Sequence, residues 1–131
     1  MKKTIVLLLF AILSIVSLNA EVLKFKSTYY SQQLMEFGGW GNWSDWKSCN
    51  VKIDINLDTD VVKIYSQREQ TYRVTKYVGE TEDDGYKTHT FRFTDQDGDR
   101  GTMRLIQRDS GRSEIYIDFA NIRWAYIVQR I

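Results

Sequence analysis

The sequence predicts an all-β domain: an antiparallel up-and-down meander of seven or eight strands that forms a small barrel. Three observations lead to this prediction. Apolar residues recur at every second position along most of the chain. β-Branched and aromatic residues are abundant, and proline is absent from all 131 residues. The connections are also too short for the crossovers that parallel strands need. A two-sheet sandwich is the alternative architecture.

The chain opens with a pattern typical of a secretory signal peptide. Met1-Lys2-Lys3 is positively charged, residues 4–18 form an apolar stretch, and Ala20 is a small residue at an expected cleavage point. This stretch is shorter than the roughly twenty residues that a spanning helix needs. We therefore expect residues 1–20 to be removed and residues 21–131 to form one β domain, secreted or periplasmic and without a membrane span. An uncleaved anchor is the alternative.

The first four strands are expected between residues 23 and 78. Each carries apolar or aromatic side chains on one parity, as a strand with one buried face does. Asp58-Thr59-Asp60 is expected to turn the second strand into the third, whereas residues 31–49 have no clear period. The sets that share a face are Leu23, Phe25, Ser27 and Tyr29; Val51, Ile53, Ile55 and Leu57; Val62 and Ile64; and Tyr72, Val74 and Val78.

Four more strands are expected after a polar, acidic loop at residues 79–85. The first two are separated by an Asp-rich hairpin turn at residues 95–99, and the next turn is at residues 109–112. Ala120-Asn121 is either a short hairpin or a bulge within one long strand. The sets that share a face are His89, Phe91 and Phe93; Met103 and Leu105; Ile115, Ile117 and Phe119; and Ile122, Trp124, Tyr126 and Val128.

Charge and cysteine content exclude several classes of protein. Loss of a signal peptide would remove two of the 18 basic residues and leave 16 against 17 acidic residues. A nearly neutral surface gives no footprint for nucleic acid or anionic lipid. Cys49 is the single cysteine, so no internal disulfide forms and the hydrophobic core must stabilise the domain. We expect Cys49 to be a small buried residue; a reactive thiol is the alternative.

The most unusual segment contains three tryptophans at three-residue spacing, Trp40, Trp43 and Trp46, among glycines. One interpretation is an aromatic platform that stacks on a sugar or another small molecule, with Asn42 and Asp45 nearby for hydrogen bonds. A second is a plug that folds over an open end of the barrel and buries its indoles. A third is a patch for protein contact.

The predicted architecture resembles that of lipocalins and avidins, which are small exported β-meanders that hold ligands in the mouth of the barrel. These families carry Gly-x-Trp near the first strand, and both Gly38-Gly39-Trp40 and Gly41-Asn42-Trp43 fit that pattern. Both triplets follow a candidate strand rather than lying within it. The resemblance also implies an arginine of the last strand packed across the tryptophan, a role that Arg130 would take.

Catalytic and metal chemistry have few candidate residues. His89 is the only histidine, and it shares its parity with Phe91, so we expect it to line the core or the barrel interior. Structural and catalytic zinc sites need several His or Cys ligands, and the chain has one of each. Asp95, Asp97 and Asp99 are weak candidates for a metal, although Asp-Gly is also a common hairpin pair. We expect no cofactor. Arg104 and Arg108 are expected to pair with acids on neighbouring strands.

Three functions fit these observations. The first is a non-catalytic binding domain, whose small molecule or carbohydrate contacts the Trp loop or a barrel interior lined by Tyr72, His89 and Tyr126. The second is a protein-interaction module, such as an inhibitor or immunity protein of the cell envelope, with a wedge such as the hairpin at residues 109–113. The third is a hydrolase that uses two carboxylates, which requires two acids in one cleft.

Overall fold

The computed structural model describes residues 22–56 and 58–131, and these residues form β-strands and no helix. No segment of this part of the chain is therefore an apolar helix that could cross a membrane. The predicted signal peptide and Leu57 lie outside the described residues.

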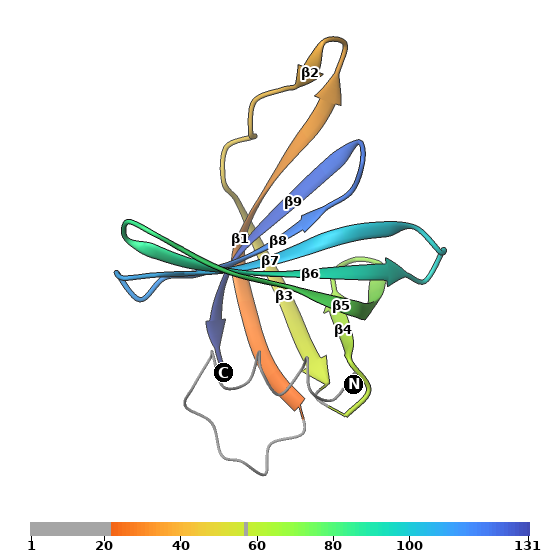
Figure 1. The fold of residues 1–131 in the computed structure, drawn as a ribbon, viewed down its shortest axis with the longest axis vertical. Coiled ribbons are helices and arrows are strands. Elements are labelled where there is room, and N and C mark those ends of the chain that lie inside the picture. Colours follow the sequence, from red (N-terminus) through yellow and green to blue (C-terminus); the bar gives the residue numbers. More distant parts are fainter. Residues whose placement is uncertain (1–21, 57) are drawn as a thin grey trace.

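Eight strands close into an antiparallel barrel, and a ninth, β2, extends β1 beyond it (Figure 1). Apart from β2, which pairs with β1 alone, strands that follow one another in sequence are neighbours in the sheet, and pairing of β1 with β9 closes the ring. The predicted barrel is thus confirmed and the sandwich is excluded. The strands are β1 (Val22–Glu36), β2 (Gly39–Trp40), β3 (Lys47–Asn56), β4 (Val61–Tyr65), β5 (Glu69–Asp83), β6 (Tyr86–Asp95), β7 (Arg100–Arg108), β8 (Ser113–Asp118) and β9 (Ile122–Arg130).

The barrel interior is filled by the alternating side chains that the sequence predicts. Ile53, Ile64 and Ile117 are fully buried, and Phe93 packs edge-on against Tyr72 with 4.8 Å between ring centroids. Burial of such side chains is the main stabilising contribution in a chain without a disulfide. The buried apolar core is made of Leu23, Phe25, Val51, Ile53, Ile55, Val62, Ile64, Tyr72, Val74, Phe91, Phe93, Met103, Leu105, Ile115, Ile117, Tyr126 and Val128.

A β-bulge changes the parity of β1, where the simple alternation was wrong. The register with β3 and β9 shifts between Ser27 and Tyr29. Tyr29, predicted to share the face of Ser27, is therefore turned out and 46% exposed, whereas Tyr30 packs against the core. An extra residue on one strand of a pair has this effect, because two residues then oppose one.

Strand β5 also departs from the prediction. Register shifts follow Val74 and Tyr77, so Tyr77 packs against the core and Val78 is 49% exposed. The expected loop at residues 79–85 is mostly strand, because β5 continues to Asp83 and pairs with β6 as far as Tyr86. The charged residues of this segment lie on an exposed extension made of β5 and β6. Both faces of the extension are polar, so its sequence looks like that of a loop.

The two ends of the barrel differ. At one end, which we call the mouth, lie the turns β4–β5, β6–β7 and β8–β9 together with the last residues of β1. Ala120-Asn121 belongs to the β8–β9 turn and is not a bulge in one strand.

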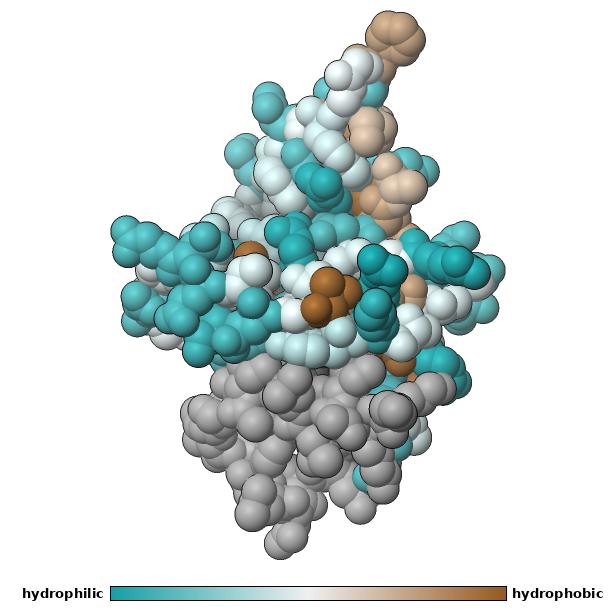
Figure 2. All heavy atoms as spheres, in the orientation of Figure 1, coloured by the Kyte–Doolittle hydropathy of each residue, from teal (hydrophilic) through white to brown (hydrophobic). Residues whose placement is uncertain are grey.

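The end of β1 and all of β2 form an arm, residues 34–40, that projects from the mouth (Figure 1). Figure 2 shows apolar side chains at the far end and along one flank of this projection. The connection from β2 to β3 runs back along β1.

Candidate functional site

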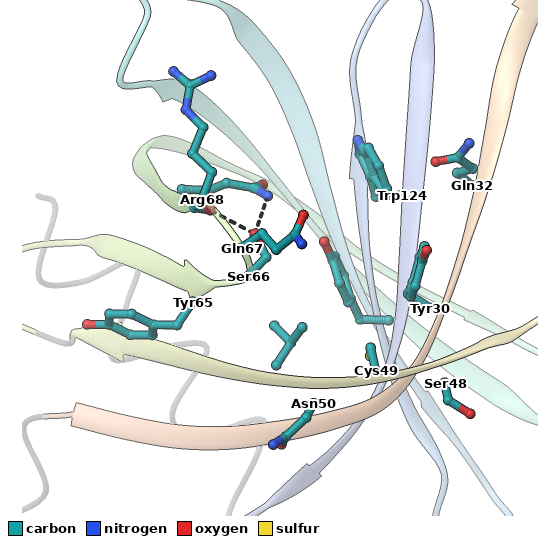
Figure 3. Close-up of a pocket in the computed structure, with 13 residues that line it drawn as sticks. Tyr30, Gln32, Ser48, Cys49, Asn50, Tyr65, Ser66, Gln67, Arg68 and Trp124 are labelled. Atoms are coloured by element: carbon teal, nitrogen blue, oxygen red, sulfur yellow. Dashed lines mark hydrogen bonds between the residues drawn. The ribbon is translucent and has the colours of Figure 1, made fainter.

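A hollow of about 780 Å³ lies at the mouth of the barrel, and we call it the mouth hollow. It lies between β1, the first half of β3, the β4–β5 turn and β9 (Figure 3). The aromatic residues of its lining are Tyr30, Tyr65, Trp124 and Tyr126, and its amide side chains are Gln32, Asn50, Gln67 and Gln70. Volumes of this size are typical of small-molecule sites.

One wall of the hollow is fixed by hydrogen bonds around Gln70. The Gln70 side-chain amide donates to Ser66 Oγ at 3.0 Å, and its carbonyl accepts a short hydrogen bond from the Tyr72 hydroxyl. Ser66 Oγ in turn donates to the Arg68 carbonyl at 2.7 Å. This chain of hydrogen bonds orients the amide and the β4–β5 turn before a ligand arrives, which lowers the entropic cost of binding.

Aromatic rings form another part of the lining. The rings of Tyr30 and Trp124 lie 6.2 Å apart at an angle of 38°, and Tyr126 is 4% exposed. Burial raises the pKa of Tyr126 to about 12, and the neighbouring Cys49 and Tyr30 add to the increase. The Tyr126 hydroxyl is therefore neutral at physiological pH and can act as a hydrogen-bond donor.

Cys49 lies in the wall of this hollow and is only partly buried. Its sulfur is 3.5 Å from the Ser27 carbonyl and 3.7 Å from Ser27 Oγ. Its parity is that of Val51 and Ile53, so the alternation along β3 carries it to the inner face. A single thiol in this position is a natural reporter for anything that enters the hollow.

The three predicted interior residues do not share one site. Tyr126 lines the mouth hollow, and Tyr72 lies behind it, with its hydroxyl on Gln70. His89 is fully buried elsewhere, with Nδ1 3.5 Å from the Tyr77 hydroxyl and 3.7 Å from a Glu80 oxygen. Burial lowers the pKa of His89, although the charge of Glu80 opposes this effect, so the imidazole is neutral at pH 7.

The Trp-rich connection lies on the outside of the barrel rather than across an end. Ser31 Oγ of β1 donates to the Ser44 carbonyl at 2.6 Å, and Trp43 packs edge-on against Tyr116 of β8 at 5.6 Å. The indoles are neither fully buried, as a plug would require, nor fully exposed, because Trp43 is 37% and Trp46 is 40% exposed. Asn42 and Asp45 are exposed on the same stretch of chain.

Beneath this connection lies an outer cluster, made of Arg108, Arg112, Glu114 and Tyr116. Glu114 points away from the barrel axis but is fully buried, and its two oxygens accept hydrogen bonds from all three other members. Burial alone would raise the pKa of Glu114, but the hydrogen bonds from Arg108 and Tyr116 and the two positive charges outweigh it and lower the pKa. Arg112 also lies 5.5 Å over the Trp46 ring.

The expected pairing of Arg104 and Arg108 with acids is confirmed. Arg104 Nε lies 2.7 Å from an Asp118 oxygen, and Arg108 Nε lies 2.8 Å from Glu114. The arginine that packs across Trp40 is Arg123 of β9, at 3.9 Å, whereas Arg130 lies 5.9 Å over Phe25. The role implied for Arg130 by the lipocalin resemblance is therefore wrong in position, because the arm places Trp40 beside the start of β9.

The Asp-rich turn has a conformational role. One Asp95 oxygen accepts the backbone N–H groups of Asp97 and Asp99, at 2.9 and 2.8 Å, and Gly98 has a φ of 86°. These bonds define an Asx-type turn. Across residues 22–56 and 58–131, no group of three or more potential ligands is arranged to hold a metal ion.

Most of the mouth hollow was missed by sequence reasoning. Tyr30 and Gln32 were hidden by the bulge in β1, and Cys49 and Gln70 lie just outside the recognised alternating runs. A signal was available for Cys49, because it continues the parity of Val51 and Ile53.

Comparison with models of protein families, with curated protein sequences and with solved structures finds no match to this chain. The resemblance to lipocalins and avidins therefore rests on architecture alone.

Proposed function

We propose that this domain is a non-catalytic binding protein that holds its ligand in the mouth hollow. The observation that carries the proposal is the hollow itself: about 780 Å³ at the mouth of the barrel, lined by aromatic rings and by amide side chains, of which that of Gln70 is held by hydrogen bonds. Sites of this kind, mainly apolar with a few oriented polar groups, are typical of ligand pockets. The proposal includes export, to the periplasm or outside the cell.

The lining favours a ligand without positive charge that has both flat and hydrogen-bonding parts. Four rings offer stacking surfaces, while four amides and the hydroxyls of Ser48 and Ser66 offer donors and acceptors. Arg68 is the only charged side chain among the lining residues.

The same lining argues against hydrolysis in this hollow. It contains no carboxylate and no imidazole, the groups most often used for general acid–base chemistry. Glycoside hydrolysis in particular requires two carboxylates at the scissile bond.

A fragment screen tests the proposal without knowledge of the natural ligand. The ¹⁵N-labelled protein is titrated with a library of uncharged fragments that includes monosaccharides, and amide shifts are mapped. We expect the shifts to cluster around Gln70, Trp124 and Cys49, and the hits to protect Cys49 from iodoacetamide. Protein with Cys49 already alkylated by a bulky maleimide should lose the same hits, while a Cys49→Ser control treated identically keeps them. The proposal would be wrong if the fragments shift amides elsewhere in the protein and still bind after Cys49 has been alkylated.

A second candidate function is protein interaction through the arm. The side chain of Phe37 at its tip is as exposed as in an extended peptide, and Leu34 and Met35 are 48% and 43% exposed. Exposed apolar side chains on a projection are typical of an anchor that inserts into a partner. This wedge differs from the hairpin at residues 109–113, in which Arg112 is bound to Glu114. A pull-down tests this candidate. The wild-type protein should recover a partner enzyme at a one-to-one ratio, and the Phe37→Ser variant should not recover it.

A further inference from the structure

The wall of the barrel is incomplete beside the mouth hollow. Strand β3 begins at Lys47 and pairs with β1 on both sides of an irregularity at Cys49 and Asn50, but its pairing with β4 starts only at Lys52, opposite Tyr65. No strand of the described chain pairs with that second edge of β3 at residues 48–51. This stretch is therefore an open sheet edge, with backbone N–H and C=O groups directed toward the gap.

The mouth hollow lies along this open edge. Alternate residues of a strand point to opposite faces, so a cavity on one face touches every second residue. Here four consecutive residues, Ser48, Cys49, Asn50 and Val51, line the hollow. Tyr65 and the β4–β5 turn also contribute to its lining, from the end of β4 (Figure 3). Two of the four β3 residues, Cys49 and Asn50, lie at the irregularity in the pairing of β3 with β1. The hollow therefore borders the open edge of β3 as well as the barrel interior, and a ligand in it meets that edge.

We propose that the ligand is an extended peptide segment that adds a short strand to the open edge of β3. This inference rests on the proposed function and names the chemical class of its ligand. Four residues of extended backbone span about 13 Å and bring alternating N–H and C=O groups, which match those of the edge. A saccharide has hydroxyls but no backbone repeat that matches a strand.

The side chains around the gap indicate which peptide fits. Residues of the added strand that point inward face Tyr126 and Trp124, which favours apolar or aromatic side chains. Arg68 is 78% exposed and lies 3.9 Å from Asp97, which is itself 58% exposed. Such an exposed pair is weak, so the guanidinium is available to a carboxylate of the peptide. We expect a segment with apolar residues and an acidic side chain or C-terminus.

The test begins with a phage-displayed random heptapeptide library selected on the full-length protein. A selected peptide is synthesised together with a series in which each backbone nitrogen is methylated in turn. Loss of one hydrogen bond at the edge should weaken binding about tenfold. We expect this loss at alternate positions of the peptide and little change at the positions between. Hydrogen exchange should slow at alternate amides within residues 48–51 when the peptide is bound.

Matched variants and a second probe separate the outcomes. Arg68→Gln should weaken the binding of a peptide with an acidic residue several-fold, whereas Arg92→Gln, which removes another exposed charge on β6, should not. Binding that is insensitive to N-methylation, or exchange that slows elsewhere, overturns the strand-addition inference. Failure to select any peptide, while uncharged fragments protect Cys49 from alkylation, also overturns it but leaves the proposed function standing. If neither peptides nor fragments protect Cys49, both proposals fall.

Discussion

Replacement of Glu114 by glutamine should destabilise the protein far more than a usual surface substitution. Glu114 is fully buried under the Trp-rich connection and accepts four hydrogen bonds from Arg108, Arg112 and Tyr116. Breaking a buried ion pair costs about 3–5 kcal/mol, and breaking an exposed one costs about 0.2–1 kcal/mol. The side chains of Arg108 and Arg112 are 37% and 44% exposed, so water compensates them in part. We therefore expect a loss of about 2–3 kcal/mol.

Urea unfolding at neutral pH, followed by tryptophan fluorescence, measures this loss, which corresponds to a fall in Tm of about 10 °C. A double-mutant cycle with Arg108→Gln should give a coupling free energy of about 1–2 kcal/mol. Glu82→Gln on the exposed extension of β5 is the control and should change stability by no more than about 0.5 kcal/mol. Two results would contradict this prediction. One is a loss of unfolding free energy in Glu114→Gln that is as small as in this control. The other is an unchanged near-UV circular dichroism spectrum, which reports the Trp43–Tyr116 contact.

Three further predictions concern stability. The pKa of His89 is lowered by burial, so near pH 6.5 the unfolded chain takes up a proton that the folded chain does not. The free energy of unfolding should therefore fall as the pH drops through 6.5, and a stable His89→Phe variant should show a smaller fall. Because the pKa of Glu114 is also lowered, both proteins should lose further stability at more acidic pH. Burial raises the pKa of Tyr126 from 10.0 to about 12, so its contribution to stability should be present below pH 10 and be lost between pH 10 and 12. Because the pKa values of Tyr72, Tyr77 and Tyr116 are also raised, urea melts at each pH should show a smaller loss in Tyr126→Phe than in the wild type, rather than no loss. A Cβ at Gly101 would lie 2.5 Å from Phe93 Cζ and 2.6 Å from the Asp118 carbonyl oxygen. Gly101→Ala should therefore lower the free energy of unfolding by about 1–3 kcal/mol. Thr102→Ala, whose side chain lies on the outer face of β7, should lower it much less.

The barrel could be predicted from sequence because each strand with one buried face carries its own signal. Ile53 and Ile55, or Phe91 and Phe93, alternate with polar residues, and short polar turns leave only antiparallel neighbours. The bulges in β1 and β5 were missed because an extra residue leaves the composition unchanged and only reverses the parity, as the positions of Tyr29 and Tyr77 show.

The candidate site depends on long-range geometry that one sequence does not contain. The mouth hollow exists because β4 is short and ends at Tyr65, so the wall beside Cys49 and Asn50 stays open. The outer cluster depends on the register between β7 and β8, which brings Ile106 opposite Glu114 and places Arg108 within reach. The tryptophans could be recognised as unusual from sequence, but the arginines and the tyrosine that contact them lie 66 to 83 positions further along the chain.

A crystal structure of the protein soaked with one fragment from the screen tests the account most directly. We expect electron density for the fragment in the mouth hollow, between Trp124, Gln70 and the edge of β3 at Cys49. Density against the outer face at Trp43 and Trp46, with the side chains of the mouth hollow unmoved and the hollow unoccupied, would contradict it.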